Sequence, residues 1–241
     1  SRFASDIAHI SPEIGGRLHV IPPVIRVQLP RRRELSSLDG RPLSLSCHCN
    51  MRPVKRVDQT VELATMISTA ARRPVELFLI GPSEVRTEQY QNMKVFYTGY
   101  LPDPLDIVRD TDFNLNTSIH DSFNYALLEA MANGVPQITT DVAGIVDTIL
   151  NYGTGLVLPT KIRSDVPIFS QYETSIFDRE RIAGLLRGFF EKMNYELLVR
   201  NCEKAALRFA PTSFINEFSS LVDTIFSRSA VGIAQQHEPS D

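Results

Sequence analysis

The segment DFNLNTSIHDSFNYALLEAMANGVPQITT, residues 112–140, contains the unit that decides the fold. Its two ends, 112–116 and 136–140, are short strand-like runs bounded by turn residues, and residues 123–133 between them carry apolar side chains at helical spacing. Two strands joined by a crossover helix run parallel in one sheet. The segment therefore predicts a strand–helix–strand unit of a parallel sheet.

The same alternation runs through most of the chain. Strands separated by helices predict an α/β fold, a doubly wound parallel sheet of the Rossmann-like kind with helices on both faces. The expected strands are 43–49, 75–80, 94–98, 112–116, 136–140 and 155–158, and the expected helices are 56–72, 103–110, 123–133, 144–150 and a helical region over 178–227.

Composition describes an ordinary globular chain. It has 241 residues, 43% of them hydrophobic, and a net charge of -3, enough for a sizeable core. The basic residues are scattered, so no nucleic-acid partner is expected. The longest basic run, Arg31 to Arg33, falls in the polar stretch 29–42, which predicts a solvated linker. A domain is expected over 43–227 and a disordered tail over 228–241.

Cysteine usage and hydropathy bear on location. Three cysteines form no even disulfide framework, and no apolar run has the length of a membrane span. We expect a cytoplasmic location, which includes the inner face of the membrane. Cys47-His48-Cys49 could suggest zinc, but in a strand the two thiols share one face and the imidazole points to the other, so a buried strand is the favoured interpretation.

Two carboxylates flank the start of the helix expected over 123–133. Ligands of doubly wound sheets bind at the carboxyl ends of strands, where helix N-termini present N–H groups to anions. Asp121 stands at this helix start and Glu129 two turns further on, at a separation of roughly 12 Å for a rise of 1.5 Å per residue. Glycosidases hold their two carboxyl groups about 5 to 9.5 Å apart. The pair therefore suits hydroxyl groups on either side of a diphosphate, while Asp121 or Ser122 could also simply cap the helix.

Residues 121–159, DSFNYALLEAMANGVPQITTDVAGIVDTILNYGTGLVLP, resemble the signature of family 4 retaining glycosyltransferases of the GT-B fold. The shared features are an acid eight positions before Glu129, the run Glu-Ala-Met-Ala-x-Gly-x-Pro, a glycine-type loop and a strand that begins Gly-Leu-Val. The resemblance extends over about residues 17–225. It implies the C-terminal, donor-binding half of such an enzyme, with 1–28 as the end of the N-terminal domain and the crossing between domains.

The resemblance also implies roles for individual residues. In NMRPVKRVDQTVELA (50–64), Arg52 and Lys55 would meet the donor's diphosphate, and with Asp121 at the transferred sugar they are the predicted catalytic residues. Glu129 would bind the ribose hydroxyls. Arg52 with Lys55 could alternatively be a surface pair. The other predicted donor-binding residues are Gly99, Tyr100 and Leu101 of VFYTGYL, together with Ser122, Phe123, Asn124 and Tyr125.

Several residues depart from the family pattern. Asp121 replaces the more frequent Glu, Asn124 and Arg56 each stand where Gly is common, and Asp147 replaces a Glu. These departures concern the donor that the site accepts more than the fold. Gly99 could serve only as a turn residue, and His120, beside the site, is expected to be structural.

The function implied is transfer of a sugar from a nucleotide-diphosphate sugar to an acceptor hydroxyl, with retention of anomeric configuration. The acceptor could be a glycan, a lipid-linked molecule or a small molecule, and an acceptor domain would lie in the same longer chain or in a separate one. No metal or other cofactor is expected. A non-catalytic nucleotide-sugar-binding module, or a phosphorylase or epimerase on the same fold, stays open. A nicotinamide-dependent dehydrogenase is disfavoured because no Gly-x-Gly-x-x-Gly follows the first strand.

Overall fold

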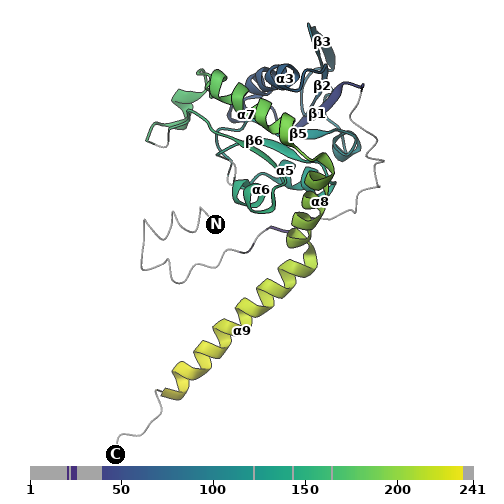
Figure 1. Ribbon diagram of the computed structural model, residues 1–241. Helices are drawn as coiled ribbons and strands as arrows, with labels where there is room; N and C mark the ends of the chain where they lie inside the picture. Colours follow the sequence, from purple (N-terminus) through teal and green to yellow (C-terminus); the bar gives the residue numbers. More distant parts are fainter. Residues whose placement is uncertain are drawn as a thin grey trace, which may run out of the picture. The chain divides into compact units, whose positions relative to one another are not determined.

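A computed structural model describes residues 21, 23–25, 40–121, 123–142, 144–163 and 165–235. Its centre is a seven-stranded sheet with the order β3-β4-β2-β1-β5-β6-β7, drawn in Figure 1. Every pair is parallel except β3 with β4. The strands are β1 (Leu43–His48), β2 (Val75–Ile80), β3 (Arg86–Tyr90), β4 (Met93–Tyr97), β5 (Phe113–Asn116), β6 (Gln137–Thr140) and β7 (Gly155–Leu158). The predicted doubly wound α/β fold is confirmed.

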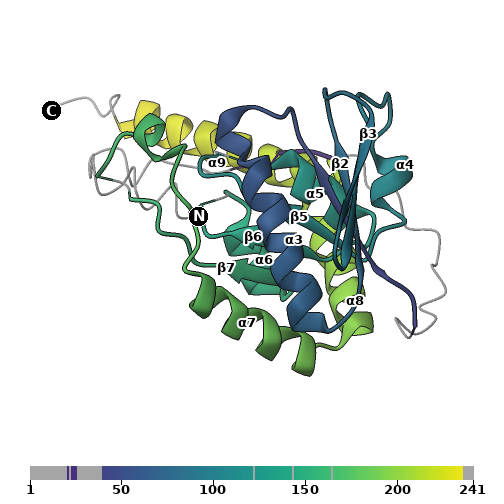
Figure 2. The same cartoon turned by 90° about the horizontal axis from the view of Figure 1, so that it is seen from above.

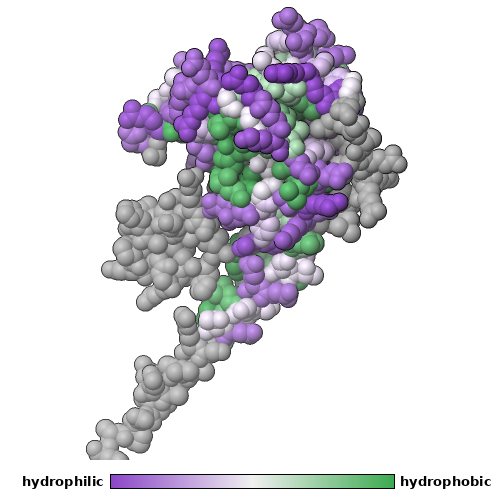
Figure 3. Space-filling model, viewed as in Figure 1, coloured by the Kyte–Doolittle hydropathy of each residue, from purple (hydrophilic) through white to green (hydrophobic). Residues whose placement is uncertain are grey.

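Helices cover both faces of the sheet, as Figures 1 and 2 show. On one face α3 (Val57–Ala71) and α7 (Arg179–Lys192) pack over the main core, to which alternate residues of the strands contribute. The outer side of α7 is mostly hydrophilic (Figure 3), as expected of an amphipathic helix that buries one stripe. The other face carries α4 (Leu105–Val108), α5 (Tyr125–Ala132), α6 (Val146–Tyr152) and α8 (Tyr195–Ala206).

Two features differ from the sequence expectation. The strand β3 was not predicted; it forms an antiparallel hairpin with β4 at the edge of the sheet. The helical region expected over 178–227 is divided into α7, α8, the short 3-10 helix η3 (Leu207–Phe209) and α9 (Pro211–Gln235). Asn194 causes one of these breaks, because its side chain accepts a hydrogen bond from Leu197 N at 3.0 Å and so caps α8. Pro211 starts α9, a position where its missing N–H has no cost.

The chain divides into two compact units. One is Val27–Ala206, which contains the sheet, and the other combines Ser1–Arg26 with Leu207–Asp241. The boundary at Ala206 thus lies inside the domain expected over 43–227. In the second unit, Ile25 N donates a hydrogen bond to Phe209 O at 3.0 Å.

The helix α9 reaches Gln235, seven residues beyond the expected start of a disordered tail at 228. No proline interrupts the chain between Pro211 and Gln235, so nothing in the sequence forces the helix to end earlier. No helix in the described part of the chain has the length and hydropathy of a membrane span. Most of the linker expected over 29–42 lies outside the described residues.

Candidate functional site

The site lies where the order of the sheet reverses. From the central strand β1 the chain moves to β2 on one side, and β5 is later added on the other side of β1. In open α/β sheets this switch point leaves a crevice at the carboxyl ends of the two strands. The segments that follow β1 and β5 therefore meet there, although they are far apart in sequence.

Hydrogen bonds hold these two segments together. After β1 the chain forms the 3-10 helix η1 (Pro53–Lys55), and Val54 O accepts a hydrogen bond from Ile119 N at 3.0 Å. The buried Thr117 hydroxyl donates to Arg56 O at 2.8 Å and lies 2.6 Å from the Thr60 hydroxyl. Buried, fully engaged polar groups of this kind fix local geometry. The backbone that carries Lys55 is thus anchored to the loop after β5.

An ion pair joins two of the predicted catalytic residues. Lys55 Nζ donates to Asp121 Oδ2 at 2.6 Å, and the two side chains are only 17% and 11% exposed. Asp121 is also tied through its backbone, since Asp121 O accepts a hydrogen bond from Gly144 N at 3.1 Å. A largely buried lysine at the carboxyl ends of the strands can exchange its carboxylate partner for the oxygens of a bound phosphate.

The helix α5 starts two residues later than expected, and its cap is Asn124. The alternative interpretation of Asp121 as the helix cap does not hold, because Asn124 Oδ1 accepts the hydrogen bond from Leu127 N at 3.2 Å. Asn124 is 2% exposed, and its Nδ2 atom has no hydrogen-bond partner among the described residues. A buried donor at a helix N-terminus suits an anion. Ser122 lies outside the described residues.

The two aromatic residues predicted beside this helix start are in contact with each other. The rings of Phe123 and Tyr125 pack edge to face with centroids 5.9 Å apart, and Tyr125 is 52% exposed. An exposed ring at this place offers a surface against which a sugar or base can pack.

Glu129 points from α5 toward the end of β1. Its Oε2 atom lies 3.2 Å from His48 Nε2, and the histidine is buried whereas the carboxylate is 39% exposed. Sequence reasoning had assigned His48 only to the strand face opposite the thiols of Cys47 and Cys49. Its position as a polar residue at the carboxyl end of a central strand is the signal that could have identified it.

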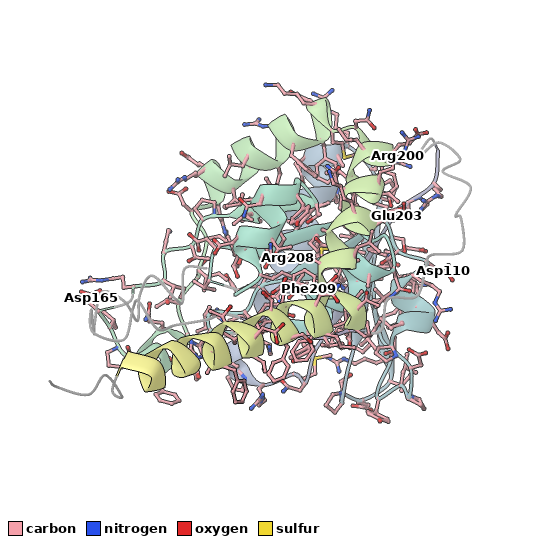
Figure 4. The ribbon with its side chains drawn as sticks, turned by 90° about the horizontal axis from the view of Figure 1, so that it is seen from below. Asp110, Asp165, Arg200, Glu203, Arg208 and Phe209 are labelled. Carbon is pink, nitrogen blue, oxygen red and sulfur yellow. The ribbon has the colours of Figure 1, made fainter. Side chains whose placement is uncertain are left out.

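The two arginines near Lys55 have different environments. Arg52 is exposed, and its guanidinium makes no hydrogen bond or ion pair with Lys55 or Asp121. Arg56 is 4% exposed; it pairs with Asp58 and donates to Thr174 O at 2.9 Å. Its backbone is left-handed, with φ 48° and ψ 52°, which explains why Gly is common at this position in the family that the sequence resembles. Arg56 thus holds the connection between β7 and α7 against the start of α3. Asp165, labelled in Figure 4, lies in this connection.

The predicted base-binding segment follows β4. Gly99 has a φ of 70°, and its carbonyl accepts hydrogen bonds from Gly81 N at 3.2 Å and from the Thr98 hydroxyl at 3.0 Å. The turn therefore favours glycine, whether or not Gly99 also contacts a nucleotide. Tyr100 is 77% exposed, whereas Leu101 packs into the small core beneath α4 and α5. Only Tyr100 of this trio presents a large side chain to solvent.

Other acidic and basic residues have structural roles or lie apart from the site. Asp110, labelled in Figure 4, and Asp112 precede β5. They therefore lie at the amino end of this strand, whereas the switch point lies at its carboxyl end. Asp112 is fully buried and accepts two hydrogen bonds from Arg41, at 2.6 and 2.9 Å. His120, expected to be structural, has an exposed side chain. The described residues contain no group of three or more His, Cys, Asp or Glu side chains placed to hold a metal ion.

The three cysteine thiols differ in acidity. A hydrogen bond from the Cys47 thiol, with lesser help from the Met51 backbone and the charge of Lys55, lowers the pKa of Cys49 to about 7 even though burial opposes this. Burial raises the pKa of Cys202, and the pKa of Cys47 is raised by its hydrogen bond to Cys49 and by burial. Thiolate is the reactive form, so Cys49 is the most reactive of the three.

We therefore expect iodoacetamide at neutral pH to alkylate Cys49 first. Its rate of modification should rise with pH and level off above about pH 7 to 8, because the thiolate forms above a pKa of about 7. Peptide mass spectrometry after short exposures measures this, with Cys49→Ser as the control that should stay largely unlabelled. Equal labelling of Cys202 and Cys49 in the folded protein would contradict the prediction.

Two curated relatives match part of the chain. N-acetyl-alpha-D-glucosaminyl L-malate synthase of Bacillus anthracis is 34% identical over 111 residues, 44% of this chain and 29% of that protein. GDP-mannose-dependent alpha-mannosyltransferase of Mycobacterium tuberculosis (strain CDC 1551 / Oshkosh) is 30% identical over 140 residues, 57% of this chain and 35% of that protein. The chain thus spans about a third of the length of these relatives.

Solved structures share the fold. The pneumococcal O-GlcNAc transferase GtfA, in complex with UDP and GlcNAc, matches 92% of this chain and 44% of its own with a TM-score of 0.61 at 16% identity. WaaG, a glycosyltransferase involved in lipopolysaccharide biosynthesis, matches 80% of this chain and 52% of its own with a TM-score of 0.53 at 20% identity. The mostly parallel sheet with flanking helices is that of GT-B glycosyltransferase structures.

The decisive match comes from the sequence profile of a protein family. The profile of Glycosyl transferases group 1 matches residues 43–166, which are 124 of the 241 residues and include both segments that meet at the switch point. The matched range contains the Lys55–Asp121 ion pair and Glu129. The chain therefore belongs to the Glycosyl transferases group 1 family.

Proposed function

We propose that this chain is the C-terminal, donor-binding half of a retaining family 4 glycosyltransferase. The observation that carries the proposal is the Lys55–Asp121 ion pair at 2.6 Å, held at the switch point beside the N-terminus of α5. A cation and a helix start face the place where a diphosphate binds in sheets of this kind. The full protein would transfer a sugar from a nucleotide-diphosphate sugar to an acceptor hydroxyl.

Each group at the site has a part in this reaction. Negative charge grows on the diphosphate as the sugar leaves, and Lys55 together with the N–H groups of α5 would stabilise it. The unpartnered Nδ2 of Asn124 supplies a further donor near the same helix start. Asp121 would accept a hydrogen bond from the transferred sugar and Glu129 from the ribose. Arg52, exposed and unattached to the pair, would reach the diphosphate from solvent.

The remaining parts of the proposal concern what lies beyond this site. An acceptor domain, in the same longer chain or in a separate one, would complete the cleft, and the acceptor would be a glycan, a lipid-linked molecule or a small molecule. The length of the relatives supports this, since the chain matches at most 35% of either curated relative. The alternative is a nucleotide-sugar-binding module without transfer. An acceptor domain that restores transfer when combined with this chain separates the two.

The first test is calorimetric titration of the chain with UDP, GDP and ADP and with their sugar conjugates. We expect one nucleotide to bind, and Glu129→Ala to weaken it about 10- to 100-fold, the effect of removing a hydrogen bond to a charged group. Glu203→Ala, an exposed carboxylate on α8 that Figure 4 labels, is the control and should leave the affinity unchanged. Lack of binding by the folded chain would overturn the proposed donor site.

A second substitution tests the assignment of Asp121. Asp121→Ala should weaken binding of the sugar conjugate more than binding of the bare nucleotide, because it removes a sugar contact and leaves Lys55 free for the diphosphate. The measured quantity is the ratio of the two dissociation constants in the wild type and the variant. Equal losses for both ligands would contradict the assignment of Asp121 to the transferred sugar.

A further inference from the structure

We propose that His48 is a positioning residue that orients the Glu129 carboxylate for the ribose of the donor nucleotide. The inference rests on the proposed function, because it deepens the role of Glu129 in that site. It gives a role to His48, the last residue of β1, which the sequence had assigned only to a buried strand.

His48 lies within hydrogen-bond distance of the Glu129 carboxylate. His48 is the last residue of β1 and is 9% exposed, while Glu129 lies on α5 with 39% of its side chain exposed. The Nε2 atom of His48 lies 3.2 Å from Glu129 Oε2. This hydrogen bond joins β1 to α5 and so fixes the Glu129 carboxylate relative to the switch point. No other hydrogen bond to the Glu129 carboxylate occurs among the described residues.

A buried network on β1 and β5 determines which ring nitrogen carries the proton. Asn114 Nδ2 lies 3.3 Å from Ser46 O, 3.0 Å from Ser46 Oγ and 3.4 Å from His48 Nδ1. A carbonyl oxygen can only accept, so the Asn114 amide must present its NH2 group to this side. His48 Nδ1 then accepts, and the proton of the neutral ring sits on Nε2, directed at Glu129.

The rest of the network holds Asn114 and the ring in place. Ser46 Oγ lies 2.9 Å from Thr111 Oγ1, and Thr111 donates to Val108 O at 2.7 Å. Ser46, Asn114 and Thr111 are each about fully buried, at 0%, 1% and 1% exposure. Side chains locked in this way support a functional group by limiting its rotamers. The chain from Thr111 to His48 therefore ends on one oxygen of Glu129 and leaves the other oxygen for ligand.

The hydrogen bond to His48 orders the Glu129 side chain before the nucleotide binds, so less conformational entropy is lost on binding. A free glutamate at the surface samples many rotamers and loses them on binding. With Oε2 held by the imidazole, Glu129 presents Oε1 in a restricted set of directions. Removing the imidazole should therefore weaken contacts to ribose hydroxyls and leave contacts to the base and the diphosphate unchanged.

The experiment compares ribonucleotides with dideoxynucleotides. UDP, GDP and ADP and their 2′,3′-dideoxy counterparts are titrated into the wild type, His48→Leu, His48→Gln and Glu129→Ala. In His48→Leu the affinity for the bound ribonucleotide should fall about five- to tenfold, within the range for a hydrogen bond of this kind. Affinity for the dideoxy compound should change less than about twofold. His48→Gln should keep most of the ribonucleotide affinity, because the glutamine amide can place an N–H near the position of Nε2.

The possible outcomes separate the positioning role from the proposed function. Loss of ribonucleotide affinity in Glu129→Ala with none in His48→Leu would overturn the role of His48 and leave the donor site standing. A wild type that binds none of the nucleotides would overturn both. If His48→Leu is poorly folded by thermal denaturation, the ratio of ribo to dideoxy affinity in His48→Gln and in His48→Asn decides. The shorter asparagine should lower that ratio, and an identical ratio in both variants and the wild type would overturn the proposal.

Discussion

Gly155→Ala is expected to destabilise the sheet severely. Gly155 begins β7 and pairs with Gln137 of β6, and a Cβ added at Gly155 would lie 1.9 Å from Gln137 O and 2.8 Å from Gln137 C. Both contacts are with backbone, which cannot move aside without opening the pairing of the two strands. We expect a loss of about 3 kcal/mol or more in the free energy of unfolding, a large part of the total for a domain.

The measurement is thermal denaturation followed by circular dichroism. A loss of that size should lower Tm by roughly 6 to 12 °C in a domain of this length. Gly184→Ala in α7 is the matched control, because nothing lies within 4 Å of the Cβ that it would add. Since alanine is the better helix former, this control should raise stability by about 0.5 to 1 kcal/mol. A Gly155→Ala protein that melts with the wild type would show that β7 can shift away from β6 at little cost.

The strand that begins at Gly155 shows how much of the fold could be predicted from the sequence. The strand that begins Gly-Leu-Val was predicted over 155–158 and is found at Gly155–Leu158. Every expected strand is present, because buried parallel strands are short apolar runs between helices with a clear period. The hairpin strand β3 was missed since its side chains are almost all exposed, so RTEQY carries no alternation of apolar and polar residues.

The candidate site could be predicted only in part. The segments that bear Lys55, Asp121 and Glu129 were identified from strand ends and from the family resemblance. The contacts were not, because Lys55 and Asp121 are 66 residues apart and His48 and Glu129 are 81 residues apart. Such pairs depend on the order of strands in the sheet, which places β5 beside β1. Local sequence patterns hold no information about that order.

The start of α5 shows a second limit. Asp121, Ser122 and Asn124 are all good N-cap residues, so propensity alone could not choose among them. The ion pair with Lys55 engages the Asp121 carboxylate, and Asn124 Oδ1 takes the cap position instead. A tertiary contact thus decided which residue caps the helix.

Lys55→Met should strongly weaken binding of the donor nucleotide. The variant removes the cation from the switch point and leaves Asp121, which is 11% exposed, without its partner. A bound diphosphate would then meet a carboxylate with no neutralising charge. We expect affinity for the bound nucleoside diphosphate to fall about 10- to 100-fold. The corresponding nucleoside monophosphate should lose much less affinity, because it lacks the phosphate nearest the transferred sugar.

Calorimetry with both ligands measures the difference. Lys204→Met, at an exposed position on α8, is the charge-matched control.

The double variant Lys55→Met/Asp121→Asn tests whether the ligand senses the pair as a unit. If the carboxylate left behind repels the diphosphate, then neutralising it should restore part of the affinity lost in Lys55→Met. Residues in direct contact show coupling energies of about 0.5 to 3 kcal/mol in such a cycle. Losses that simply add would mean that the ligand does not sense the two groups as a unit. If neither variant lost affinity, the diphosphate would bind away from both groups, and the ion pair at 2.6 Å would be a structural link between the two segments and not part of a donor site.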